Sequence, residues 1–240
     1  MKSILESLQG GLVVSCQAPT DSPLHHPAAI AAMAEAALNQ GAVGVRIDTP
    51  DHIQAVRARC GGHPQAPRGK HPIIGLWKQV MPPSEVYITP QFHQAAAVAQ
   101  AGSDIIAIDA TQRPRPGGET LGQLIQQIHE RLGQVVMADV DTLDNALIAI
   151  DAGADCVGTT LFGYTQETQA EKPPGFDLLK AMVQRCAVPV ICEGGIASPE
   201  QARQALELGA YAVVVGTAIT GIDSLVQRYV GAMTAGKLFP

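Results

Sequence analysis

The sequence predicts an α/β fold in which residues 1–240 form a single (β/α)8 barrel. Eight short runs of apolar, often β-branched residues alternate with longer Ala-rich segments of helical period, as expected for parallel strands covered by helices. Eight strand–helix units in 240 residues average roughly 30 residues each, which suits a compact barrel of this type. Glycines 41, 102, 153 and 209 each join a helix end to a strand, at spacings that would hold two units. A doubly wound open sheet is the alternative.

The expected strands are near-continuous apolar runs. They cover residues 12–15, 43–47, 73–77, 105–108, 135–138, 156–158, 190–192 and 212–215. Runs of this kind indicate strands that are buried on both faces, as in a barrel with an outer layer of helices.

The connecting helices have readable start and stop signals. The segment from Pro27 to Gly41 has proline in its first turn, apolar residues on one face and glycine past its end. The segment from Ser198 to Gly209 begins with an N-cap serine and a proline. We also expect short helices at the N-terminus and over residues 217–220. The Gly- and Pro-rich stretch 60–72 is expected to be a surface loop at the barrel end opposite the catalytic loops.

The composition favours a small-molecule partner in the cytoplasm. A net charge of −6 disfavours binding to nucleic acid or to an anionic membrane surface. No run reaches the roughly 18 apolar residues of a membrane span, and the N-terminus does not resemble a signal peptide. The five scattered cysteines indicate buried free thiols. The seven histidines have no metal-ligand spacing, so we expect them to be solvated and expect no metal site.

Polar side chains gather where the expected strands end. In barrels of this kind the reacting groups come from the C-terminal ends of the strands and from the loops that follow. One such residue could be a structural charge, but a ring of them indicates a polar substrate. The ring comprises Gln17, Arg46, Asp48, Lys78, Asp109, Asp139, Thr159, Thr160, Glu193 and Thr217.

Lys78 and Glu193 form the predicted catalytic pair. Lys78 ends an apolar strand and is expected to be partly desolvated beside Arg46, which would favour its neutral, reactive form. An amine and a carboxylate that face each other across a substrate suit proton removal beside a carbonyl and proton delivery to the other face. A Schiff-base aldolase lysine and a structural ion pair are the alternatives.

The loops after the last two expected strands predict a phosphate site. The segments EGGIASPE and VVVGTAITG place glycines and hydroxyls where barrels often bind phosphate through backbone N–H groups. The expected donors are the amides of Gly194, Gly195, Gly216 and Thr217, because glycine lets the backbone approach an anion closely. On its own, a Gly-Gly pair could equally form a turn.

A set of motifs in a fixed order covers nearly the whole chain. They are LVVSCQA, GVRI, PIIGLWK followed by VYITP, IIAIDATQRPRP, ADVDT, GTTLFGYT, VICEGGIASPEQA and GAYAVVVGTAIT. In order and spacing the sequence resembles the N-acetylmannosamine-6-phosphate 2-epimerases of sialic acid catabolism, the NanE type. The resemblance implies a phosphate-binding TIM barrel, dimeric and without cofactor, that interconverts the 6-phosphates of N-acetylmannosamine and N-acetylglucosamine.

The resemblance also implies roles for individual residues. Lys78 and Glu193 resemble the acid/base pair at C2 of the sugar. The residues that would hold the substrate are Gln17, Arg46, Asp139, Thr160, Tyr164 and Arg113.

Two positions depart from the family pattern. Gly195 and Gly221 stand where the family commonly has basic residues, which leaves the phosphate to backbone amides, Thr217 and a loop arginine. A Schiff-base aldolase acting on a phosphorylated sugar and a non-catalytic phosphosugar-binding barrel are the alternative functions.

Overall fold

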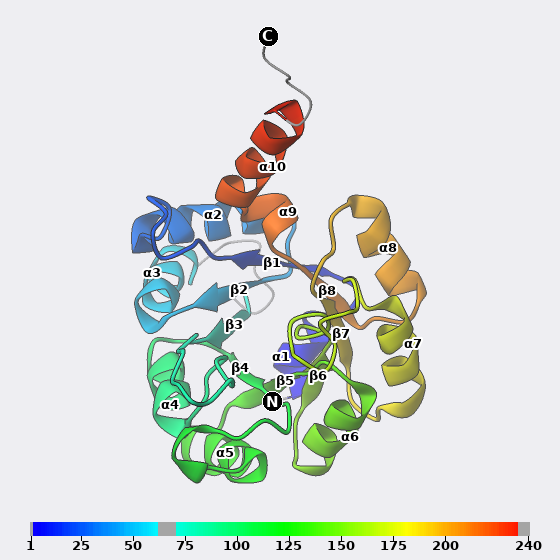
Figure 1. The fold of residues 1–240 in the computed structure, drawn as a ribbon. Helices are drawn as coiled ribbons and strands as arrows, with labels where there is room; N and C mark the ends of the chain where they lie inside the picture. Colours follow the sequence, from blue (N-terminus) through cyan, green and yellow to red (C-terminus); the bar gives the residue numbers. More distant parts are fainter. Residues whose placement is uncertain (1, 62–70, 235–240) are drawn as a thin grey trace.

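The computed structural model describes residues 2–61 and 71–234 and shows a closed barrel of eight parallel strands (Figure 1). Each strand pairs with the next in sequence, and β1 pairs with β8 to close the barrel. The strands are β1 (Leu12–Cys16), β2 (Gly44–Asp48), β3 (Ile73–Leu76), β4 (Ile105–Asp109), β5 (Val135–Asp139), β6 (Cys156–Gly158), β7 (Val190–Glu193) and β8 (Ala212–Val215). The predicted (β/α)8 barrel is confirmed, and the open sheet is excluded.

Both faces of the strands are buried, which is why they read as continuous apolar runs. In β4, Ile105 and Ala107 pack inside the barrel, whereas Ile106 and Ile108 pack against the helices. β4, β5 and β7 each continue one residue beyond the expected range and end on a carboxylate: Asp109, Asp139 and Glu193.

Helices surround the barrel in the expected alternation (Figure 1). They are α1 (Lys2–Glu6), α2 (Pro27–Asn39), α3 (Pro50–Cys60), α4 (Phe92–Gln100), α5 (Leu121–Gln127), α6 (Leu143–Asp151), α7 (Phe176–Arg185), α8 (Pro199–Glu207), α9 (Thr217–Thr220) and α10 (Ile222–Thr234). A 3₁₀ turn, η2 (Pro116–Gly118), precedes α5, and a π-helical turn, η3 (Ile128–Leu132), follows it.

The helix signals in the sequence have the expected geometry. The Ser198 side chain accepts a hydrogen bond from the Gln201 amide and caps α8, and Pro199 is its first residue. The glycines at 41, 102, 153 and 209 all have φ between 96° and 105°, a left-handed conformation that non-glycine residues rarely adopt. Their recurrence therefore reflects the same backbone turn between a helix and the next strand.

The N-terminal segment closes one end of the barrel. Leu5 of α1 and the nearby Leu8 are buried with Val13 in the barrel interior. A side chain at Gly44, the first residue of β2, would meet Leu8, so this plug lies at the N-terminal ends of the strands. The loop expected at 60–72 lies largely outside the described residues.

The five cysteines are free thiols, as predicted. Four are buried and Cys186 is half-buried. Within residues 2–61 and 71–234, no helix combines the length and the apolar character that crossing a membrane requires.

Candidate active site

Arg46 lies at the centre of the candidate site, at the C-terminal end of the barrel. It belongs to β2, where Val45 and Ile47 face the helices, so alternation directs the arginine side chain into the barrel. Only 1% of Arg46 is exposed. A buried guanidinium needs anionic partners, because burial removes the water that would stabilise its charge.

Two carboxylates from across the barrel supply those partners. Arg46 Nη2 donates to Asp139 Oδ2 over 2.6 Å, and Arg46 Nη1 donates to Asp139 Oδ1 over 3.1 Å. Arg46 Nη1 also donates to Glu193 Oε2 over 2.8 Å. One cation therefore faces two carboxylates, and the three groups together carry a net negative charge when both acids are ionised.

Glu193 is the carboxylate of this trio that solvent can reach. Its side chain is 12% exposed, whereas that of Asp139 is 0% exposed. Burial raises the pKa of Glu193 to about 7, with the charge of Asp139 acting in the same direction and the charges of Arg46 and Lys78 acting against them. Glu193 can thus gain or lose a proton near neutral pH.

Two threonines at the end of β6 hold Glu193. The Thr159 hydroxyl donates to the Glu193 carbonyl over 2.8 Å and accepts from the Glu193 amide over 3.0 Å. The Thr160 hydroxyl lies 2.6 Å from Asp139 Oδ1 and 3.2 Å from Glu193 Oε2. Gly158 leaves the room for this arrangement, because a Cβ there would lie 3.1 Å from Thr160 Oγ1.

Lys78 extends from the opposite wall and is held by Gln17. Lys78 Nζ donates to Gln17 Oε1 over 2.6 Å, and Gln17 Nε2 donates to Ser15 Oγ over 2.9 Å. The Lys78 amide donates to Asp48 Oδ1 over 2.9 Å. The structure thus places Gln17 beside the amine of the predicted catalytic lysine.

The expectation that Lys78 is partly desolvated is wrong. The residue is exposed, because β3 ends at Leu76 and Lys78 lies two residues beyond it, in an isolated bridge with Ile88. Burial therefore gives no reason to expect a reactive amine at Lys78 in the conformation described.

Tyr87 is a candidate that the sequence reasoning missed. Its ring packs against the interior of the barrel, and its carbonyl accepts from the Gln79 amide. Burial raises the pKa of Tyr87 to about 12, and the charges of Asp139 and Asp109 add to the shift. The phenol therefore stays a neutral hydrogen-bond donor near the carboxylates. In the sequence, the short apolar segment VYITP after the third strand was the feature that could have pointed to Tyr87. This segment pairs with Lys78 through Ile88.

Arg113 and Tyr164 lie in the loops of this end. Arg113 Nη2 donates to Asp109 Oδ2 over 2.7 Å, and its Nε donates to Thr111 Oγ1 over 2.9 Å. Tyr164 is exposed, and a Cβ added to Gly194 would lie 3.8 Å from its Cε2 atom. Tyr164 therefore borders the predicted phosphate loops, whereas Arg113 is tied to the end of β4.

The predicted phosphate loops have the open backbone that such a site needs. Gly194 and Gly195 have φ of 101° and 70°, and Gly216 is the N-cap of the short helix α9, which begins at Thr217. A Cβ on Gly195 would lie 2.4 Å from Pro173 Cβ. This contact and the positive φ explain why a glycine stands where the resemblance led us to expect a basic residue.

The expectation of solvated histidines is wrong for His52 and His71, which are buried. Burial lowers the pKa of His52, and the neighbouring His25 ring, 4.7 Å away between centroids, acts in the same direction. In the part of the chain that the structure describes, no three His, Cys, Asp or Glu side chains gather as a metal site would require.

Comparison with known proteins decides the family. The family model described as putative N-acetylmannosamine-6-phosphate epimerase, NanE, matches residues 30–235. A protein of Synechococcus elongatus named putative N-acetylmannosamine-6-phosphate 2-epimerase is 59% identical over 232 residues, which are 96% of this chain and 97% of that protein. This chain belongs to the NanE family.

Further relatives agree with this membership. A Thermosynechococcus vestitus protein with the same putative name is 58% identical over 97% of each chain. The solved structure of the N-acetylmannosamine-6-phosphate 2-epimerase from Clostridium perfringens is 38% identical, covers 95% of each chain and superposes with a TM-score of 0.87. The NanE family fold thus extends over nearly the whole of this chain.

Proposed function

We propose that this protein is an epimerase that interconverts N-acetylmannosamine 6-phosphate and N-acetylglucosamine 6-phosphate by removing and returning the proton at C2. The family membership supports the substrate. The observation that carries the chemistry is Glu193, a carboxyl group whose pKa is raised to about 7 and which is held at the barrel mouth by Arg46. A group whose pKa lies near the working pH can act as acid in one direction and as base in the other.

The reaction takes place on the open-chain sugar. C2 carries a hydrogen beside the C1 aldehyde, so its removal as a proton leaves an enolate. Return of a proton to the same face restores the substrate, and return to the other face gives the epimer. Lys78 and Glu193 are the proposed acid/base pair for the two faces, and no step consumes a cofactor.

The surrounding residues position this pair and the sugar. Arg46 and Thr160 hold the Glu193 carboxylate, and Gln17 holds the Lys78 amine. Tyr87 is the proposed neutral donor to a sugar oxygen. Sugar contacts are proposed for Gln17, Arg46, Asp139, Thr160, Tyr164 and Arg113.

The phosphate end of the substrate belongs at the loops after β7 and β8. The proposed donors are the backbone amides of Gly194, Gly195, Gly216 and Thr217. Placing the phosphate there sets the C2 end of the sugar over the barrel mouth, where Glu193 lies at the end of the same β7 strand.

The proposal includes a homodimer in the cytoplasm that acts in amino sugar and sialic acid catabolism. Its support is the family membership and, for the dimer, the exposed large apolar residues of α10, among them Tyr229 and Met233.

One assay tests the function. The purified protein is incubated with N-acetylmannosamine 6-phosphate and the products are followed by NMR. Appearance of N-acetylglucosamine 6-phosphate is expected. Fragments with fewer carbon atoms would instead indicate an aldolase, and tight binding without turnover would indicate a sugar-binding barrel.

A further inference from the structure

Two groups proposed for the reaction lie on one arm of the chain. Residues 77–89, which we call the arm, follow β3 and double back on themselves. Lys78 pairs with Ile88 in an antiparallel bridge. Next to it, the Gln79 amide donates to the Tyr87 carbonyl over 2.9 Å. Lys78 is on the outgoing half and Tyr87 on the returning half, so whatever sets the position of the arm also sets the position of both groups.

The base of the arm is tied to the strands on either side of β3. The Lys78 amide donates to Asp48 Oδ1, at the end of β2, over 2.9 Å. The Asp109 amide, at the end of β4, donates to the Ile88 carbonyl over 2.9 Å. Farther out, Val80 is 80% exposed, and segments with few buried apolar contacts open readily. The outer part of the arm therefore depends on support from a neighbouring segment.

The loop between β4 and α5 supplies that support. The Ser84 hydroxyl donates to the Pro114 carbonyl over 2.8 Å. Just beyond the arm, Gln91 Nε2 donates to the Pro116 carbonyl over 3.1 Å. A proline fixes its own φ and extends the residue before it, and Arg115, between the two prolines, is extended with φ of −82° and ψ of 154°. The loop thus presents a stiff row of carbonyls to the arm.

The Arg115 side chain completes this contact from the inside. Only 7% of the residue is exposed. Its Nη1 donates to the Pro90 carbonyl over 3.1 Å, and its Nη2 donates to the Asp109 carbonyl. One guanidinium therefore joins the residue that follows the arm to the last residue of β4. Because a buried cation needs such acceptors, the same hydrogen bonds hold Arg115 in place and fix the backbone around it.

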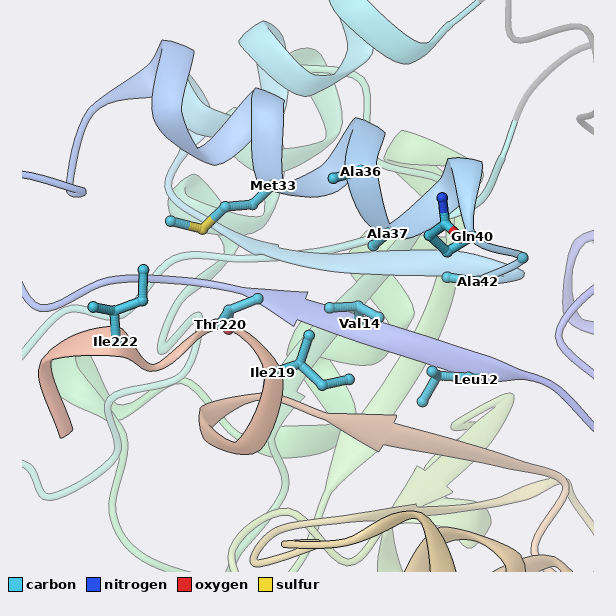
Figure 2. Close-up of a pocket in the computed structure, with 11 residues that line it drawn as sticks. Leu12, Val14, Met33, Ala36, Ala37, Gln40, Ala42, Ile219, Thr220 and Ile222 are labelled. Atoms are coloured by element: carbon cyan, nitrogen blue, oxygen red, sulfur yellow. The ribbon is translucent and has the colours of Figure 1, made fainter. Parts of the chain in front are cut away.

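The Lys78 amine is held separately, from the side of β1. Lys78 Nζ donates to Gln17 Oε1, and Gln17 Nε2 donates to Ser15 Oγ. The Thr220 hydroxyl donates to the Ser15 carbonyl over 2.8 Å. Figure 2 shows Thr220, in α9, beside β1 at the edge of an apolar pocket between α2 and α9. The amine reaches this chain of hydrogen bonds only while the arm keeps its place.

We propose that Arg115 is a positioning residue for the epimerisation: it fixes the arm on the loop after β4 and so places Lys78 and Tyr87 over the sugar. The inference rests on the proposed function, since it assigns Arg115 a part in the same reaction. Arg115 acts through the arm and touches neither the sugar nor the reacting atoms. A displacement of about 1 Å in a reacting group can cost roughly 100-fold in rate, so a loosened arm would slow the chemical step.

The kinetic test compares kcat with KM. Arg115→Met removes both donors and keeps an apolar side chain of similar length, so kcat should fall roughly 10- to 100-fold. KM should change little, because the proposed phosphate donors follow β7 and β8, across the barrel from β3. Arg115→Lys keeps the charge and one donor and should recover part of the loss. Ser84→Ala removes a contact of the outer arm and should lower kcat by a smaller factor.

Trp77 reports the state of the arm without turnover. It is the single tryptophan of the chain and the first residue of the arm. Its amide donates to Thr89 Oγ1 over 3.1 Å, across the base of the arm. Acrylamide should quench its fluorescence more strongly in Arg115→Met than in the wild type, with Arg115→Lys in between, because a loosened arm admits the quencher.

Arg57→Met is the matched control at the other end of the barrel. Arg57 also donates to main-chain carbonyls, that of Gly102 over 2.9 Å and that of His71 over 3.2 Å. His71 precedes β3, so these contacts lie at the N-terminal ends of the strands. Arg57→Met should lower the melting temperature, while kcat and the quenching of Trp77 stay as in the wild type.

The measurements separate a positioning role from stability and from the proposed function. Folded Arg115→Met with the quenching or the kcat of the wild type would overturn the proposal, and so would an equal loss of kcat in Arg57→Met. If Arg115→Met does not fold, Arg115→Lys is judged by the same measurements. A wild type without epimerase activity would contradict the proposed function, and the quenching would still decide whether Arg115 holds the arm.

Discussion

Arg46 and Glu193 meet over 2.8 Å at the mouth of the barrel, although β1 and β8 separate their strands, β2 and β7. The same guanidinium holds Asp139, so a single cation restrains two carboxylates. The consequence is a Glu193 whose pKa is raised to about 7, since burial and the charge of Asp139 outweigh the attraction of Arg46.

This relationship predicts the acidic side of the pH profile. Once Glu193 is protonated, it can no longer accept the C2 proton. The value of kcat/KM, which reports the free enzyme, should therefore fall as the pH drops through about 7. The fall should occur in both directions of the reaction, because their ratio equals an equilibrium constant.

Asp139→Asn tests the cause of that pKa. It removes a negative charge that raises the pKa of Glu193, and it leaves Glu193 as the one carboxylate of the trio that pairs with Arg46. The acidic limb of the profile, the pH range in which kcat/KM falls as the pH drops, should therefore move to lower pH. Asp177→Asn, on the exposed side of α7, is the control that should leave the limb in place. An unmoved limb in folded Asp139→Asn would mean that another group controls the profile.

The Thr160 hydroxyl predicts a positioning effect. It lies within hydrogen-bonding distance of both Asp139 and Glu193. Hydrogen bonds to charged groups contribute about 1.5–3 kcal/mol, so Thr160→Val should lower kcat roughly 10- to 100-fold. Thr160→Ser keeps the hydroxyl and should restore most of the rate. Equal rates for the two variants would show that the hydroxyl does not act through the carboxylates.

The predicted phosphate site is tested at Gly216. A Cβ there would lie 3.4 Å from Ser15 Cβ, so the neighbouring atoms leave room for a side chain. Gly216→Asp places an anion beside the proposed phosphate position and should raise KM by at least roughly tenfold while kcat changes little, because uniform binding is lost. Gly216→Ala adds the same Cβ without the charge and is the reference for any effect of the side chain on the backbone, so its KM should stay well below that of Gly216→Asp. Equal turnover of N-acetylmannosamine with and without its phosphate would argue against this site.

The fold was predictable because each strand is a continuous apolar run and each helix has its own end signals. Placing Asp139 and Glu193 at one end followed from the same reasoning, since they are the last residues of β5 and β7. Arg46 lies two residues before the end of β2, and its long side chain extends to them. Their pairing did not follow. Strand register puts Arg46 beside Ile74, and only the three-dimensional barrel brings its side chain to Asp139 and Glu193.

Lys78 and α10 show two further limits of the sequence. The apolar run before Lys78 suggested burial, but the strand ends at Leu76 and leaves the lysine exposed. The apolar residues of α10 recur at helical spacing, as they would in a helix packed on its own barrel. Periodicity indicates that a helix has an apolar face and does not say whether that face packs on the barrel, and none of the residues Ile222–Thr234 that form α10 in the described structure is buried.

The proposed proton transfer predicts the fate of hydrogen at C2. If Lys78 and Glu193 remove and return this proton, epimerisation in D2O must place deuterium at C2 of the product. Lys78→Met and Glu193→Gln preserve approximate size and should each lower kcat by at least about 100-fold, the low end for a positioned acid or base. Lys180→Met and Glu207→Gln, on the outer helices α7 and α8, should keep full activity.

Exchange into unconverted substrate then separates one base from two. With two bases on opposite faces, each variant should still exchange the C2 proton of the epimer that its remaining group can reach, while interconversion is blocked. With a single base that reaches both faces, only the variant that lacks it should lose all exchange, and the other group would be an orienting partner. Near-wild-type kcat in either folded variant would remove that residue from the acid/base pair. The two-base outcome is the one that the positions favour, because Glu193 ends β7 and Lys78 follows β3 on the opposite wall of the closed barrel.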